Sequence, residues 1–126
     1  MKKLALILAL VSTILIMSSP SFAAERESFY SDLICETVYS GNTDSLPSGL
    51  RPDCQTEFVI MEFDWATRTK LYECIGQSLV YAVEAVKYPV CVLLARNDEE
   101  LAFGLSQDLA PMGIKLVVFD TRPYDP

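Results

Sequence analysis

The chain of 126 residues contains no histidine. This absence excludes Ser-His-Asp and Cys-His catalysis, zinc sites that use histidine, and histidine-based pH switches. Basic residues are also scarce: 10 Lys and Arg against 17 Asp and Glu give a net charge of −7. Such a charge argues against a protein that coats nucleic acid regardless of sequence, because that binding needs a basic surface. No low-complexity tract and no internal repeat is visible, which excludes a solenoid or a disordered tail.

A long apolar run occurs only at the N-terminus. Two lysines at positions 2 and 3 precede the largely apolar residues 4–17, and the small-residue pattern Ser-Phe-Ala follows at 21–23. This arrangement is typical of a secretory signal peptide, with cleavage expected after Ala23. An uncleaved anchor is the alternative, but the run spans only about 21 Å as a helix, short of a hydrocarbon core of about 30 Å. We therefore expect residues 24–126 to form one exported domain, periplasmic or secreted, without stable membrane association.

Four cysteines lie in that domain, at positions 35, 54, 74 and 91, and none of them forms a Cys-x-x-Cys pair. An even number of cysteines in an oxidising compartment allows two disulfides in three possible pairings. Cys74 and Cys91, however, fall in apolar segments, where a free cysteine serves as a small hydrophobic side chain. The sequence leaves disulfides and free thiols open, while a zinc cluster is improbable at this spacing.

Hydrophobic periodicity predicts three helices and at least four strands. The helices are expected over 26–38, 67–87 and 99–110, and the strands over 53–57, 58–64, 90–95 and 115–120. Residues 40–52, rich in Gly, Pro and small polar residues, predict a loop with at most a short strand around Leu46 or Leu50. Thr67 or Thr69 would cap the long helix, and Asp98 the last one.

With that short strand included, the predicted order is α-β-β-β-α-β-α-β. A hairpin that leads into alternating strands and helices indicates an α/β fold with a mixed central sheet and helices on both faces.

Acidic residues gather on one face of the strand over 58–64. Alternate side chains of a strand share a face, which groups Phe58, Ile60, Glu62 and Asp64. Carboxylates in an apolar strand are costly to bury unless they are paired or bind a cation. Hairpin pairing would bring Asp53 beside Glu62, and converging carboxylates suit Mg²⁺ or Mn²⁺. The alternative is a solvated strand end whose charge Lys70 or Arg68 neutralises.

A polar stripe follows the long helix. Steps of four, three and four residues join Lys70, Cys74, Gln77 and Tyr81 on one side of it. This stripe either lines a polar site or is an ordinary solvent-exposed edge of the helix.

Three segments together resemble a known family: RPDCQT at 51–56, EFD at 62–64 and KLYECIGQSLVY at 70–81. They are similar to the PD-(D/E)XK superfamily of restriction-endonuclease-like nucleases, and most of all to its small standalone members of RecB type. The resemblance covers about residues 26–96. It implies a restriction-endonuclease-like core of order α-β-β-β-α-β, to which this chain would add a helix and a strand.

The resemblance also implies roles for the residues that match its motifs. Asp53 would be the Asp of the PD element and Glu62 the acid of the (D/E)XK element, together holding Mg²⁺ or Mn²⁺. Gln77 and Tyr81 match the Q-x-x-x-Y helix motif and would position a substrate phosphate or a metal-bound water. Glu36 sits where many members carry an additional helix Glu, a further metal ligand.

One position departs from the family pattern. Asp64 stands where members have a catalytic lysine, two residues after the acid. Lys70, or Arg68, is placed to supply that positive charge from the following helix. Asp64 itself would then be an added metal ligand or would orient Lys70.

Two functions follow as expectations. The first is an exported, Mg²⁺- or Mn²⁺-dependent nuclease-like phosphodiesterase that acts on DNA or RNA. The second is a catalytically degenerate acidic protein on the same fold, which binds or inhibits a basic protein partner. The acid at position 64 and the negative charge favour the second function. The retention of Asp53, Glu62, Lys70, Gln77 and Tyr81 favours the first.

Overall fold

The computed structural model describes residues 22–125. The predicted leader lies outside this range apart from residues 22 and 23, which begin the first helix. The helices are α2 (Phe22–Thr37), α3 (Arg68–Ala85) and α4 (Asp98–Leu105), with short 3₁₀ helices η1 (Ala110–Met112) and η2 (Arg122–Tyr124). The strands are β1 (Cys54–Gln55), β2 (Val59–Trp65), β3 (Tyr88–Ala95) and β4 (Lys115–Asp120). Within the described range, no helix has both the length and the apolar character that crossing a membrane requires.

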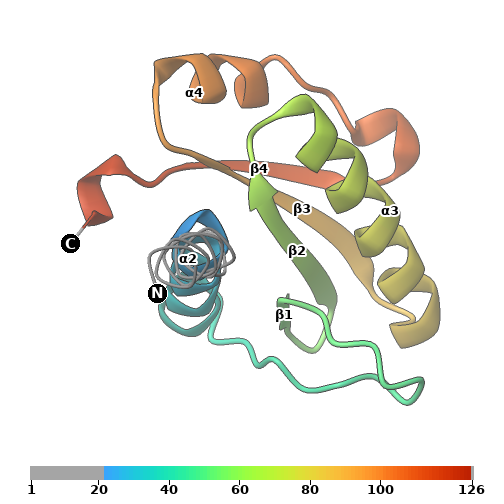
Figure 1. Ribbon diagram of the computed structural model, residues 1–126. Helices are drawn as coiled ribbons and strands as arrows, with labels where there is room; N and C mark the ends of the chain where they lie inside the picture. The colour runs from blue at the N-terminus through green and yellow to red at the C-terminus, as the bar shows by residue number, and fades with distance from the viewer. Residues whose placement is uncertain (1–21, 126) are drawn as a thin grey trace, which may run out of the picture.

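The four strands form one mixed sheet in the order β1-β2-β3-β4. β1 runs antiparallel to β2, while β2, β3 and β4 are mutually parallel. The parallel strands are joined through α3 and α4, as two consecutive strand-helix-strand units (Figure 1). The predicted α/β class with a mixed sheet is therefore confirmed.

The helices cover both faces of the sheet, as expected (Figure 1). α2 packs on one face through Tyr30 and Ile34, against alternate residues of β2 and β3. α3 and α4 pack on the opposite face, where Leu71 and Cys74 contact the other set of β3 side chains. Residues 90–95 of β3 are all buried, because a central parallel strand covered on both faces has no polar side.

Residues 40–52 form a loop, as predicted, but without the short strand that the predicted order included. It contributes no strand to the described fold, only an isolated antiparallel bridge between Asn42 and Gln55. Leu46 and Leu50 instead close a turn, in which the N–H of Leu46 donates to the carbonyl of Leu50 at 2.7 Å and Gly49 has a φ of 90°. Leu46 then packs against Tyr81 of α3. Within residues 22–125, two strands and not three therefore precede α3. The predicted order α-β-β-β-α-β-α-β, and the α-β-β-β-α-β core order that the resemblance implies, each contain one strand too many at this point.

The last helix is also shorter than predicted. Its N-cap is Asn97 and not Asp98, since the Asn97 side chain accepts a hydrogen bond from the N–H of Glu100 at 2.9 Å. The helix ends at Leu105, and the Asp108 carboxylate accepts from the N–H of Ala110 at 3.0 Å. Short polar side chains that bond to nearby backbone compete with helix formation, which stops α4 before residue 110.

Two disulfides resolve the question that the cysteines left open. Cys35–Cys54 ties α2 to β1, and Cys74–Cys91 ties α3 to β3. All four residues are buried. Each face of the sheet is thus fastened covalently to the helix that covers it.

Removal of either disulfide should destabilise the protein by a similar amount. The bonds close loops of 19 and 17 residues, and in the chain-entropy model each contributes about 3 kcal/mol. We expect the Cys35→Ala/Cys54→Ala and Cys74→Ala/Cys91→Ala variants to lose about that free energy of unfolding in urea titrations. Unchanged midpoints in either variant would contradict the corresponding bond.

Val86, which follows α3, should be replaceable with a gain in stability. It has a left-handed backbone (φ 54°, ψ 49°), and its side chain is 90% exposed. That conformation costs a residue with a Cβ about 1–2 kcal/mol, a cost that glycine avoids. Val86→Gly should therefore raise the free energy of unfolding by about 1 kcal/mol. The matched Val83→Gly change, inside the helix and also exposed, should lower it by a similar amount; equal effects would refute the explanation.

Candidate functional site

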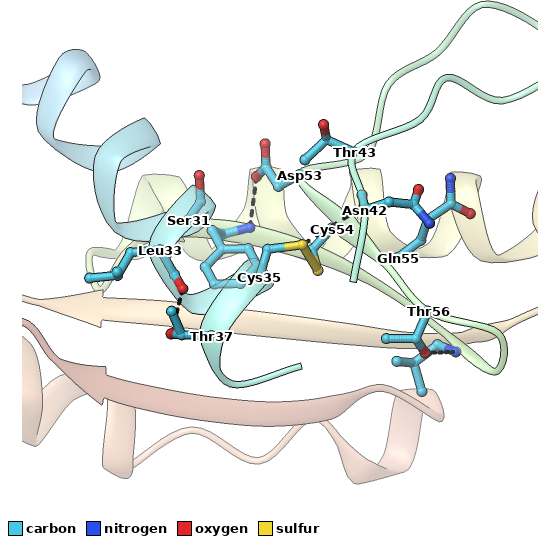
Figure 2. The surroundings of a disulfide bond; sticks show 12 residues. Ser31, Leu33, Cys35, Thr37, Asn42, Thr43, Asp53, Cys54, Gln55 and Thr56 are labelled. Atoms are coloured by element: carbon cyan, nitrogen blue, oxygen red, sulfur yellow. Dashed lines mark hydrogen bonds between the residues drawn. A yellow bond between two sulfur atoms is a disulfide. The ribbon is translucent and has the colours of Figure 1, made fainter. Parts of the chain in front are cut away.

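Asp53 and Glu62 face each other where β1 and β2 pass under α3, and Asp64 lies on the same face of β2 as Glu62; we call these three residues the acid site. The pairing of Cys54 with Met61 puts Asp53 opposite Glu62 on the neighbouring strand. The backbone N–H of Phe63 donates to Oδ2 of Asp53 at 2.9 Å, next to the Cys35–Cys54 disulfide (Figure 2). The prediction that hairpin pairing brings Asp53 beside Glu62 is confirmed.

The Asp53 and Glu62 carboxyls interact so closely that their protonation is linked. Burial, and then the charge of Asp53, raise the pKa of Glu62 to about 10. Burial also raises the pKa of Asp53, although the Phe63 N–H opposes the shift. Two carboxylates side by side in a poorly solvated place cannot both ionise at low cost. The pair therefore keeps one proton at neutral pH.

Asp64 is the second buried acid on the same face of β2, at 4% exposure. Burial, and then the charge of Glu27, raise its pKa to about 7, while Lys70 works in the opposite direction. Its Oδ1 lies 3.8 Å from Nζ of Lys70. Its Oδ2 is buried and has no hydrogen-bonding partner within the described part of the chain. Burying a carboxylate oxygen without a hydrogen-bonding partner is unfavourable, and binding a proton or a cation would remove that cost.

Lys70 lies at the rim of the acid site. Its ammonium is 2.7 Å from Glu73 as well as 3.8 Å from Asp64, and its side chain is 40% exposed. It also lowers the pKa of Glu27, which burial raises. Arg68, the other predicted source of positive charge, is exposed and forms no ion pair with any residue in the range 22–125. Of the two, Lys70 is the cation beside the acids.

Tyr81 and Gln77 occupy the same side of α3, one turn apart. Tyr81 is 9% exposed, and its pKa is raised by burial and then by the charges of Glu62 and Asp53. The phenol therefore lies close to the carboxyl pair. Gln77 is exposed and borders a surface groove together with Tyr81. The stripe on α3 thus brings Lys70 and Tyr81 to the acid site, while Gln77 lies at its outer edge.

Glu36, predicted as the helix ligand, is not near the acid site, and Glu27 takes that place. Glu36 is exposed near the end of α2. Nine residues at 100° each put it on the opposite side of the helix from Glu27 and about 13.5 Å further along. Glu27 is seven residues before the buried Ile34, hence on the helix face that packs against the sheet. That spacing is the signal in the sequence that would have identified it.

The predicted ligand set of Asp53, Glu62, Glu36 and Asp64 is not assembled. Within residues 22–125, no group of three or more His, Cys, Asp or Glu side chains is arranged to hold a metal ion. The Asp53 and Glu62 carboxyls converge, and Asp64 lies on the same face of β2 as Glu62. Glu36 is far from them, near the end of α2.

Comparisons with protein-family models, with curated proteins and with solved structures give no match for this chain.

The raised pKa values predict an unusual dependence of stability on pH. A carboxyl whose pKa is higher in the folded state binds more protons folded than unfolded, so it stabilises the fold at low pH and less as pH rises. For Glu62 this loss runs from about pH 4.5 to about pH 10, and for Asp64 from about pH 3.8 to about pH 7. We expect the protein to be more stable at pH 5 than at pH 8.

Glu62→Gln should remove much of that slope and raise the free energy of unfolding at pH 8 by at least about 1 kcal/mol, since one pKa unit corresponds to about 1.4 kcal/mol. Glu57→Gln, an exposed change in the turn before β2, is the matched control and should leave the slope as it is. Urea titrations between pH 5 and pH 9 measure both. A wild-type protein whose stability rises over that interval would contradict the raised pKa values of Glu62 and Asp64.

Proposed function

We propose that this chain is an exported, divalent-cation-dependent phosphodiesterase of nuclease type, which acts on DNA or RNA through a restriction-endonuclease-like core. The observation that carries the proposal is the acid site. Three carboxyls with raised pKa values lie near one another, Asp53 opposite Glu62 and Asp64 two residues further along β2. Lys70 lies beside Asp64, and Tyr81 lies close to the other two. Burying these groups together is costly for the fold. A catalytic need for negative charge at this point explains their presence.

The acid site fits a hard divalent cation in its chemistry. All of its donors are carboxylate oxygens, which Mg²⁺ and Mn²⁺ prefer. Asp53 and Glu62 would hold the ion, and Asp64, whose Oδ2 has no hydrogen-bonding partner among residues 22–125, would add negative charge beside it. A bound cation would offset the burial and the repulsion from Asp53 that together keep Glu62 protonated. It would also supply Lewis-acid activation of the phosphodiester and lower the pKa of a coordinated water.

The remaining side chains would act on the substrate. Lys70, whose pKa is raised by its hydrogen bond to Glu73, stays fully charged at neutral pH and would stabilise negative charge that develops on the phosphate. The phenol of Tyr81 stays protonated, since its pKa is raised, and can donate a hydrogen bond to a phosphate oxygen. Gln77, without a partner among residues 22–125, would position the next group of the polymer.

Export rests on two supports. The first is the signal-peptide pattern over residues 1–23. The second is the pair of disulfides, which persist in oxidising compartments and are rare in the cytosol. A periplasmic or secreted location suits a protein that degrades nucleic acid outside the cell.

One observation favours a second candidate. The closest ionic partner of Lys70 is Glu73, and its ion pairs do not include Asp53 or Glu62. With Asp64 at the usual lysine position and a net charge of −7, the same fold would suit an acidic protein that binds a basic protein partner. In that case the negative surface charge would recognise the partner, and the buried acid site would have no catalytic role.

Hydrolysis assays distinguish the two candidates. We expect single-stranded or double-stranded DNA or RNA to be cleaved with Mg²⁺ or Mn²⁺ and not with EDTA. Asp53→Asn and Glu62→Gln should each lower kcat by about 100-fold or more, because the cation would lose a ligand and electrostatic stabilisation of the transition state with it. Lys70→Ala should also be impaired by about 100-fold, and Lys70→Arg should retain part of the activity.

Lys115→Ala, an exposed change on β4, is the control and should keep full activity. Cleavage that survives Asp53→Asn would belong to a contaminant. Failure of every polymer to be cleaved at millimolar cation would contradict the enzyme and leave the acidic binding protein.

A further inference from the structure

A largely apolar groove runs along the outer side of α3, directly beside the acid site. Its volume is about 470 Å³, within the usual range of small-molecule sites. Its main lining residues are Leu50, Tyr72, Gly76, Gln77, Val80 and Tyr81. Tyr72 is 64% exposed and Val80 55%, which is high for large apolar side chains. The turn at 46–50 forms one wall, held against the helix by hydrogen bonds of 2.7 Å from Ser48 to Glu84.

Gly76 keeps this groove open. It lies in the interior of α3, where glycine costs helix stability relative to alanine. A Cβ built at this position meets no atom within 4 Å, so contacts inside the chain do not require glycine there. Its φ is not positive either, which removes the usual backbone reason. The missing side chain leaves a flat space next to the exposed ring of Tyr72, one helical turn away.

The groove and the acid site share a border. Tyr81 lines the groove and lies close to Glu62 and Asp53. Glu73 also lines the groove and pairs with Lys70, which contacts Asp64. In the part of the chain that the structure describes, neither Tyr72 nor Gln77 uses its side chain in a hydrogen bond. The site where a phosphodiester would react is therefore bordered by the exposed ring of Tyr72, the open space at Gly76 and the Gln77 amide.

We propose that this groove binds an unpaired nucleobase of the substrate strand, so that the substrate class is single-stranded nucleic acid. The inference rests on the proposed function, because a cation held at the acid site would bind the adjacent phosphate. The base stacks on Tyr72, fills the space over Gly76 and contacts Val80, while the Gln77 amide bonds to the base edge. Bases inside a duplex are already stacked and paired and cannot reach Tyr72.

The charge of the surroundings sets how such a strand would bind. Lys70 is the cation at this border, and it is already paired with Glu73 and Asp64. Phosphate contacts therefore contribute little, and most of the affinity comes from stacking, which is tolerant of base identity. Since counterion release scales with the number of neutralised phosphates, binding should depend only weakly on salt.

The test measures binding by fluorescence anisotropy with labelled single-stranded DNA, in EDTA so that no strand is cleaved. The probe is compared with an abasic strand of the same length and with a duplex. We expect the base-bearing strand to bind about tenfold or more tightly than either. Tyr72→Ala should abolish that difference and Tyr72→Phe should preserve it.

A second pair of variants separates groove occupancy from folding. Gly76→Leu places a side chain in open space, so it should fold normally and yet block the base. Val83→Leu, an exposed change on α3 outside the groove lining, should leave binding unchanged. Urea titrations of both variants check the fold.

Equal binding of abasic and base-bearing strands, or base preference that survives Gly76→Leu and Tyr72→Ala, would overturn the inference. No binding of any strand, or binding of a basic peptide in its place, would overturn it as well. A protein that cleaves polymers through the acid site but prefers duplex would refute only the groove assignment. A protein that binds bases in the groove but never cleaves would refute only the enzyme.

Discussion

The central constraint on this structure is the burial of the Glu62 carboxyl against the Asp53 carboxyl, an unfavourable interaction that the rest of the fold must offset. Like charges at short range in a poorly solvated place repel strongly, and the fold relieves them only in part, with a retained proton and the N–H of Phe63. Both disulfides lie next to these two residues. Cys54 follows Asp53, Cys91 pairs with Glu62 across β2 and β3, and Sγ of Cys74 lies 3.4 Å from the Glu62 carbonyl. The covalent ties hold together the region in which electrostatic repulsion is strongest.

This placement links stability to function. Carboxyls that are unfavourable for the bare fold are suited to a cation, because the same negative charge that is costly without an ion attracts one. Asp64 extends the pattern, with one oxygen near Lys70 and the other without a partner among residues 22–125. The disulfides and the well-packed strand β3 offset the loss of stability that such a site causes.

The parts of the fold that were predictable follow from periodicity. Alternation along β2 put Glu62 and Asp64 on one face, and hairpin pairing put Asp53 beside Glu62, as the register confirms. The amphipathic pattern of α3 gave its extent to within two residues at either end. These predictions succeeded because the backbone period of a strand or a helix decides on which face every second or every fourth side chain lies.

The predictions that failed depend on which of two neighbouring residues caps a helix and on contacts between residues that are distant in the sequence. Asn97 and Asp98 are both good N-caps, and only the backbone conformation decided between them. The loop over 40–52 became a turn because Leu46 found a place against Tyr81 that no local pattern indicates. Glu27 and not Glu36 faces the acids, since the position of α2 on the sheet is fixed by Tyr30 and Ile34. Such choices depend on tertiary packing.

The most direct test of the central claim is a calorimetric titration of Mn²⁺ at pH 7 in buffers of different ionisation enthalpy. If Glu62 holds a proton that a cation must displace, one ion should bind per chain and release close to one proton, and Glu62→Gln should abolish that release. No binding at millimolar Mn²⁺, or binding without proton release, would contradict the claim that this repulsion is what a cation relieves.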